Sequence, residues 1–184
     1  MGVALDSSQN LYICDNSYHV IRKVTRSTGK ASIVAGTTTA GGSAVSAAAT
    51  SSKLSYPMSI TLDSSNNLYI VDTTKSVVRK VSSSDGIMTI FAGTFESSCT
   101  STVASASGCG DDGPATSAKL VVHENNGDYW ALGVDSSDNV YLSESEGQSV
   151  RVISPSVRQR PRCDAFNCCC VSTVTPSSLL FRFH

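Results

Sequence analysis

The sequence predicts an all-β protein built from repeats of a four-stranded antiparallel unit. Three related segments carry an Asp-Ser-Ser turn that begins at Asp6, Asp63 and Asp135, which gives spacings of 57 and 72 residues. Val, Ile and Tyr are enriched around these turns, and no stretch of about 11 residues keeps a helical period. Because the whole unit repeats, the pattern favours a β-propeller over a single sandwich.

Each unit divides into four expected strands. In the first unit these strands are GVALD, NLYICD, HVIRKV and ASIVAG, and the second unit ends in the related MTIFAG at Gly93. The first two strands are joined by a DSSxN turn, in which Asp and Asn bond the nearby backbone and tolerate left-handed conformations. The third unit has no counterpart of the VAG strand, so two full blades and most of a third are predicted.

Two side-chain columns accompany the turn aspartates. Tyrosines recur at Tyr12, Tyr69 and Tyr141, and arginines recur ten residues later at Arg22, Arg79 and Arg151. Acidic residues lie across the same hairpins, at Asp15, Asp72 and Glu144. We interpret these columns as structural pairs between strands or blades, and a ligand-binding polar ring is the alternative. An EF-hand calcium loop is excluded at the turns, because the sixth position lacks Gly.

The combined motifs resemble a known family. GVALDSSQNLYICD, HVIRKV, IVAG and GDDGPATSAKL are similar to the signature of NHL-repeat β-propellers, and the resemblance covers residues 2–155. It implies four-stranded antiparallel blades arranged around an axis. Gln9, Asn66 and Asp138 depart from the pattern, since the family usually has Gly at this position.

The predicted segments are residues 2–58 as blade 1 with a linker, 59–131 as blade 2 with a long loop and an insertion, 132–155 as a partial blade 3, and 156–184 as a tail. Because propellers close with about 4–8 blades, this segment is not expected to close on itself. Its ends would expose an apolar face or an unpaired edge. Three explanations stay open: a fragment of a longer propeller, head-to-tail association into a ring or filament, or a small array capped by its own tail.

The cysteines favour an oxidising compartment. There are seven, so at least one is free or pairs with another chain. Cys99 and Cys109 bracket a Ser/Thr/Ala-rich loop and are candidates for a short disulfide. The tail holds a further cysteine cluster and is either a disulfide-bonded clasp or translated non-coding sequence. No secretory signal is recognisable at the start, so either a leader has been lost or the chain is a fragment.

The insertion within 121–130 is the candidate binding loop. It mixes His, carboxylate and aromatic side chains, at His123, Glu124, Asp128, Tyr129 and Trp130. Loops on a rigid propeller commonly carry binding residues. The alternative is a long hairpin whose Trp packs into the core just before the first strand of blade 3.

Surface modification is a separate prediction. Ser and Thr make up 49 of the 184 residues, while charged residues make up only 16%. Two Ser/Thr-rich loops therefore offer candidate O-glycan carriers, at Thr37, Thr38, Thr39, Thr100, Ser101 and Thr102. Ordinary polar loops are the alternative interpretation.

Several function classes lack support. The net charge of −1 provides no basic field for nucleic acid, and no apolar run approaches the roughly 20 residues of a membrane span. The three histidines occupy unrelated positions, and GxSxG, HExxH and phosphate-loop motifs do not occur. No catalytic residue, metal site or cofactor is therefore predicted.

We predict a non-enzymatic, secreted or extracellular scaffold that acts through protein–protein contacts. Its open blade ends would pair with other copies of the chain or with missing blades, and glycans are a further candidate partner. The alternative is a fragment of a full NHL propeller. Such a propeller would serve as a ligand-binding receptor or sensor domain, or as a metal-dependent lyase or hydrolase.

Overall fold

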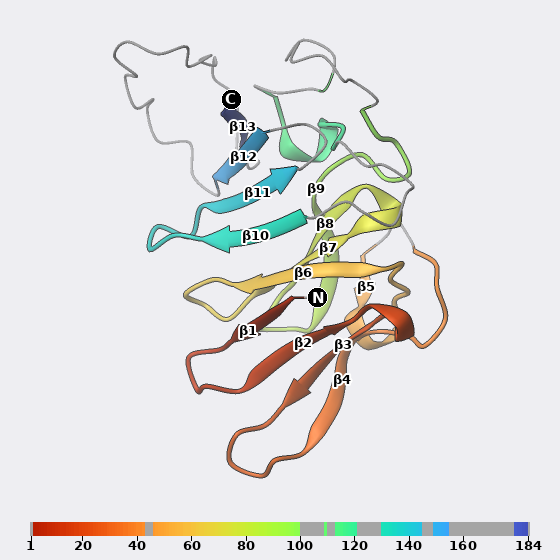
Figure 1. Cartoon of the computed structure of the whole chain (residues 1–184), viewed down its shortest axis with the longest axis vertical. Helices are drawn as coiled ribbons and strands as arrows, with labels where there is room; N and C mark the ends of the chain where they lie inside the picture. Colours follow the sequence, from red (N-terminus) through yellow and green to blue (C-terminus); the bar gives the residue numbers. More distant parts are fainter. Residues whose placement is uncertain are drawn as a thin grey trace.

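The fold consists of antiparallel sheets stacked along the long axis of the molecule (Figure 1). The structure, a computed structural model, describes residues 2–42, 46–99, 109, 113–120, 130–144, 149–154 and 179–183. Within these ranges the regular elements are β-strands and short 3-10 turns, with no α-helix. The all-β prediction is confirmed.

Blade 1 is a four-stranded sheet in the sequential order β1-β2-β3-β4. Its strands are β1 (Val3–Leu5), β2 (Leu11–Asp15), β3 (Val20–Val24) and β4 (Ala31–Gly36). A 3-10 turn, η1 (Asn16–Tyr18), connects β2 to β3. The register places Val3 opposite Ile13 and Leu11 opposite Val24, so every predicted strand of the first unit forms.

Blade 2 repeats this arrangement and adds one short strand at its outer edge. The order is β5-β9-β8-β7-β6. The strands are β5 (Ala47–Ala48), β6 (Pro57–Leu62), β7 (Leu68–Asp72), β8 (Val77–Val81) and β9 (Ile87–Ala92), with η3 (Thr73–Lys75) between β7 and β8. Because β5 comes from the linker after blade 1, the linker extends the sheet of the following blade.

Blade 3 has a fourth strand that the repeat pattern does not reveal. Its order is β10-β11-β12-β13, with β10 (Trp130–Val134), β11 (Val140–Glu144), β12 (Ser149–Ser154) and β13 (Leu179–Phe183). β13 comes from the tail and pairs antiparallel with β12, Val150 lying opposite Phe183. It lacks the VAG motif of β4 and β9, so the sequence shows three strands where the structure has four.

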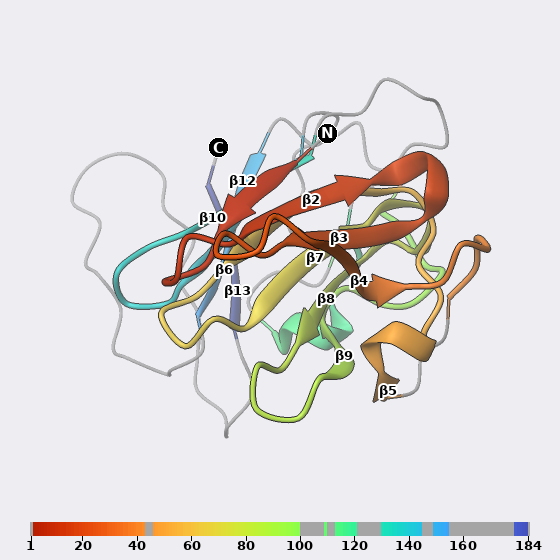
Figure 2. The same cartoon turned by 90° about the horizontal axis from the view of Figure 1, so that it is seen from below.

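The first strands of the blades lie side by side, as expected around a propeller axis. β6 contacts both β1 and β10, and the backbone N–H of Leu132 donates a 3.0 Å hydrogen bond to Oγ of Ser59. Viewed from below, blade 1 is nearest the viewer and blade 2 lies behind it (Figure 2). The described blades form an open stack, so the prediction that the segment does not close on itself is confirmed.

Two glycines end the fourth strands for a steric reason. Gly36 and Gly93 adopt φ of +88° and +93°. A Cβ built on Gly36 would overlap the carbonyl oxygen of His19, and one on Gly93 would overlap that of Ser76. The VAG motif therefore requires Gly both for its conformation and for close packing against the preceding hairpin.

The matched linkers fill the spaces between blades. Their Ala-Thr-Ser sequences form the 3-10 turns η2 (Ala49–Ser51) and η4 (Ala115–Ser117). Ala49 and Leu54 are buried in a core shared by blades 1 and 2, and Leu120 occupies the matching place between blades 2 and 3. The hydrophobic core thus lies between the sheets, and each blade depends on its neighbours for burial.

Candidate functional site

The repeated turn is organised by its aspartate. Oδ1 of Asp6 accepts hydrogen bonds from the backbone N–H groups of Ser8 (3.0 Å) and Asn10 (2.8 Å), and its Oδ2 accepts one from Nδ2 of Asn10 (2.8 Å). The hydroxyl of Tyr12 donates to the same Oδ2 at 3.4 Å. Matching bonds form around the other two turn aspartates. The predicted Asp and Tyr columns therefore meet in one network per blade.

Hydrogen bonds favour the ionised form of two of these aspartates, Asp6 and Asp135. Desolvation opposes ionisation of Asp6, but its bonds from Asn10 and the ammonium of Lys23, 3.0 Å away, together lower its pKa to about 2. The hydrogen bond from the Asn139 side chain is the largest cause that lowers the pKa of Asp135. The carboxyl groups of Asp6 and Asp135 are therefore ionised at neutral pH.

The residue that departs from the family's Gly connects neighbouring blades. Asn66 has φ of +60°, and its Oδ1 accepts the backbone N–H of Ser7 in blade 1 at 2.9 Å while its Nδ2 donates to Oγ of Ser7 at 3.0 Å. Asp138, at φ +62°, accepts the N–H and hydroxyl of Ser64 at 2.9 and 2.7 Å. We call these repeated contacts the turn ladder.

The acid–arginine pairs form as predicted across each hairpin, but their surroundings differ. Nε of Arg22 donates to Asp15 at 2.7 Å in blade 1, where the two side chains are 36% and 22% exposed. The same pair in blade 2, Arg79 with Asp72 at 3.1 Å, is 1% and 0% exposed. In blade 2 the backbone N–H of Ser55, in the linker, donates to Asp72 at 2.7 Å, and the ring of Phe95 lies 5.3 Å from the Arg79 guanidinium.

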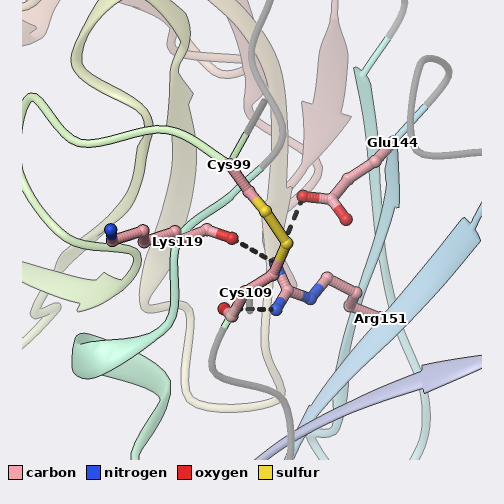
Figure 3. Close-up of a disulfide and its surroundings, with 5 residues drawn as sticks. All are labelled: Cys99, Cys109, Lys119, Glu144 and Arg151. Atoms are coloured by element: carbon pink, nitrogen blue, oxygen red, sulfur yellow. Dashed lines mark hydrogen bonds and ion pairs between the residues drawn. A yellow bond between two sulfur atoms is a disulfide. The ribbon is translucent and has the colours of Figure 1, made fainter. Parts of the chain in front are cut away.

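In blade 3 the pair anchors the disulfide loop. Nη1 of Arg151 lies 3.4 Å from Glu144 and donates to the carbonyl oxygen of Lys119 at 2.9 Å, while Nη2 donates to that of Cys109 at 3.2 Å (Figure 3). Cys109 is bonded to Cys99, with 5.6 Å between their Cα atoms. Arginine in blades 2 and 3 thus lies under the linker from the preceding blade, and in blade 1 it is uncovered.

The same asymmetry appears in the apolar columns. We call the face of a blade that points toward the preceding blade its front face, and the opposite side its rear face. On the front face of blade 2, Ile60 and Leu62 are 4% and 8% exposed, whereas their counterparts Val3 and Leu5 in blade 1 are 63% and 59% exposed. On the rear face of blade 3, Tyr141 and Val150 are exposed.

The other sequence candidates divide between described and undescribed residues. Trp130 opens β10 and is buried in the core between blades 2 and 3, the placement expected if it packs into the core. The remaining binding-loop candidates, His123, Glu124, Asp128 and Tyr129, lie outside the described residues.

The O-glycan candidates divide in the same way. Thr38 and Thr39 are exposed after β4, and Thr37 is half-buried with its hydroxyl donating to the carbonyl oxygen of Thr39 at 3.4 Å. Thr100, Ser101 and Thr102 lie outside the described residues, as does the tail from 156 to 178. In the part of the chain that the structure describes, no three His, Cys, Asp or Glu side chains gather as metal ligands would.

Sequence reasoning missed the residues that build the turn ladder. Ser7 and Ser64 are identical in the repeat, and Asn10, Asn67 and Asn139 form a further column, so the signal was present. The sequence pattern of a single blade does not show that Asn66 and Asp138 bond to the preceding blade. Their partners, Ser7 and Ser64, lie 59 and 74 residues away.

Comparisons with known proteins agree with this architecture. A structure of a protein of unknown function from Bacteroides thetaiotaomicron matches with TM-score 0.62 and 21% identity, covering 78% of this chain and 32% of that one. An auxiliary nutrient binding protein from Bacteroides ovatus matches with TM-score 0.59 and 21% identity, covering 84% and 37%. The chain therefore spans about a third of the length of these structures. At such identities the likeness shows the fold alone.

No curated protein matches the chain. Within the described ranges, no helix has the length and apolar character needed to cross a bilayer. A family model does match, and it covers nearly all of the three blades: the model of the Teneurin NHL domain aligns with residues 3–154. The chain belongs to the Teneurin NHL domain family, whose fold is an NHL-repeat β-propeller.

Proposed function

We propose that this chain is a non-enzymatic scaffold that works through protein–protein contacts at its uncovered blade faces. The observation that carries the proposal is the exposure of Val3 and Leu5, whose counterparts Ile60 and Leu62 are buried by the preceding blade. Exposed apolar columns of this kind favour association, because burying them removes apolar surface from water.

Self-association is the contact that the repeat supports best. Blade 1 covers the front face of blade 2, and blade 2 covers the front face of blade 3, so the chain already contains this interface twice. The rear face of blade 3 in a further copy presents Tyr141 and Val150 in the places that Tyr12 and Ile21 occupy on the rear face of blade 1. Repeated head-to-tail contacts would build a ring or a filament, according to whether the rotation closes.

An extracellular setting is part of the proposal. The Cys99–Cys109 disulfide supports it, since disulfides persist in oxidising compartments. The exposed Thr38 and Thr39 are the O-glycan candidates that the described residues leave accessible. Mass spectrometry of material from the native source would show hexose-type additions on these threonines, and unmodified peptides throughout would remove glycosylation from the proposal.

The scaffold proposal is tested by measuring mass against concentration with light scattering. We expect the mass to rise above 19.2 kDa with concentration, and Leu5→Glu to abolish the rise by placing a charge in the apolar contact. Ser27→Glu is the matched control, because it adds the same charge to the exposed turn between β3 and β4. A constant 19.2 kDa mass, or equal effects of both variants, would contradict the proposal.

A further inference from the structure

The linker between blades 1 and 2 is held from both sides by side chains that titrate. The backbone N–H of Ser55 donates to Oδ1 of Asp72 in blade 2 at 2.7 Å. The backbone N–H of the next residue, Tyr56, donates to Nδ1 of His19 in blade 1 at 3.3 Å. The hydroxyl of Thr74 in blade 2 also donates to the carbonyl oxygen of Ser55 at 2.8 Å. The linker is therefore attached to blade 2 through Ser55 and to blade 1 through Tyr56.

Tyr56 has a strained backbone. Its φ of +54° lies in the left-handed region, which is unfavourable for a bulky residue. The next residue is Pro57, and a residue before proline favours the extended region. Both preferences would return Tyr56 to an extended conformation if nothing restrained it. His19 supplies a restraint, because its hydrogen bond is joined by edge-to-face packing of the two rings, with centroids 4.8 Å apart.

The fold does not require a histidine at position 19. His19 follows η1 with a left-handed φ of +56°, and Ser76 has the same place after η3 in blade 2, with φ of +57°. A small residue that does not titrate is therefore compatible with this backbone. The imidazole adds a ring nitrogen that accepts the N–H of Tyr56. It accepts only in the neutral form, since both nitrogens of an imidazolium are donors.

The charged groups around this contact do not provide a substitute for the lost bond. The titratable or charged side chains on the hairpin of His19, on the nearby linker and on the facing hairpin of blade 2 are Asp15, Tyr18, Arg22, Lys53, Tyr56, Asp72, Lys75 and Arg79. Strands β4 and β6 carry none. Asp15 pairs with Arg22 and Asp72 with Arg79, and within the described ranges no carboxylate forms an ion pair with His19. A proton on His19 therefore removes a hydrogen bond and gains no ion pair in exchange.

Asp72 is the second titratable acceptor of the linker. Burial raises its pKa to about 6, although the Arg79 guanidinium acts in the opposite direction. Acid therefore also weakens the attachment at Ser55, because a protonated carboxyl group is a poorer acceptor. A variant at position 19 is needed to separate the two acceptors.

We propose that His19 is a pH-sensitive latch for the linker between blades 1 and 2. The neutral imidazole holds Tyr56 in its left-handed conformation and keeps the linker closed on blade 1. Imidazoles ordinarily gain a proton between about pH 8 and 5, and the bond to Tyr56 is then lost. Tyr56, which is 48% exposed, returns toward the extended conformation and its ring moves away from His19. The latch lies between two described blades, so it does not depend on the proposed self-association.

An NMR titration of the full chain at low concentration tests the latch. We expect the amide resonance of Tyr56 and the ring Cε1–H resonance of His19 to shift together, with one midpoint between about pH 8 and 5. The amide of Ser7 is the internal control and should not shift, because its acceptor, Oδ1 of Asn66, does not titrate. We also expect the hydrogen-exchange protection of the Tyr56 amide, relative to its intrinsic rate, to fall by about tenfold between about pH 7.5 and 5.5.

Two variants separate the latch from the other titrating groups. His19→Asn places a carboxamide oxygen where Nδ1 lies, tolerates the left-handed conformation and does not titrate. The Tyr56 amide of this variant should keep its neutral-pH resonance in acid. His19→Ser introduces the residue that blade 2 has at this position and removes both the ring and the acceptor. Its Tyr56 amide should show the acid form of the resonance already at neutral pH. Circular dichroism establishes that both variants fold.

The contradicting results are distinct from those for the proposed function. A Tyr56 amide that does not follow the His19 ring would overturn the latch. A titration that persists unchanged in His19→Asn would assign the response to Asp72 and would overturn it as well. Either result leaves the proposed self-association standing, because these readouts come from dilute single chains. A chain that never associates would likewise leave the latch standing.

Discussion

Nε of Arg79 donates a 3.1 Å hydrogen bond to Asp72, and both side chains are closed off from solvent by the linker that follows blade 1. The equivalent Arg22–Asp15 pair has the same two residue types at the same spacing and a shorter 2.7 Å contact, yet its side chains are 36% and 22% exposed. The same pair therefore has two different environments among the described blades.

Removing the two acids should have unequal effects on stability. Asp72→Ala leaves the Arg79 guanidinium buried without its counterion, and we expect a loss of about 3–5 kcal/mol in the free energy of unfolding. Asp15→Ala should cost less than about 1 kcal/mol, since water can solvate Arg22. Urea unfolding of dilute protein, followed by the fluorescence of Trp130, measures both. Equal losses would show that the linker does not bury the blade 2 pair.

Much of this fold could be predicted from the sequence, because the repeat places Asp6, Asp63 and Asp135 at the same point of each blade. The strands, the turns and the acid–arginine pairs all follow from local spacing. The fourth strand of blade 3 could not be predicted, because β13 is held by pairing with β12 and carries no repeat motif. The turn ladder was missed for a related reason, since its partners belong to different blades.

Acid should weaken the repeated turn. The pKa of Asp6 in the folded chain, about 2, is below its ordinary value of 3.8, so its contribution to stability is complete above about pH 4 and is lost as the pH falls toward 2. Asp6→Asn should be less stable than the wild type at neutral pH and should approach it on acidification. Unfolding free energies measured from pH 7 to pH 2 test this. A difference that stays constant across that range would contradict it.

Glycine should be essential at the end of β4 but not at the preceding turn. Gly36→Ala introduces a Cβ that overlaps the backbone of His19, so we expect a loss well above the roughly 1–2 kcal/mol of left-handed strain alone. Gly29→Ala is the matched control, because Gly29 has φ of +66° but a Cβ added there would have no heavy atom within 4 Å. Thermal unfolding of the two variants gives the comparison. Similar shifts in Tm would show that strain, and not packing, selects the glycine.

The thiol of Cys14 should be unreactive in the folded chain. Cys14 is buried between blades 1 and 2, and burial raises its pKa to about 12, so the thiolate that reacts with alkylating agents is scarce. Peptide mapping after brief iodoacetamide treatment should find Cys14 unmodified in native protein and fully modified in urea. Rapid labelling of the native chain would mean that the two blades separate readily.

The central claim is that the uncovered blade faces meet other copies of the chain, and electron microscopy of concentrated native protein tests it most directly. We expect rings or filaments in which neighbouring chains continue the blade stack without a gap. Leu5→Glu should reduce them to single particles. A field of isolated particles of one chain each, at concentrations where the wild type is folded and soluble, would contradict the account.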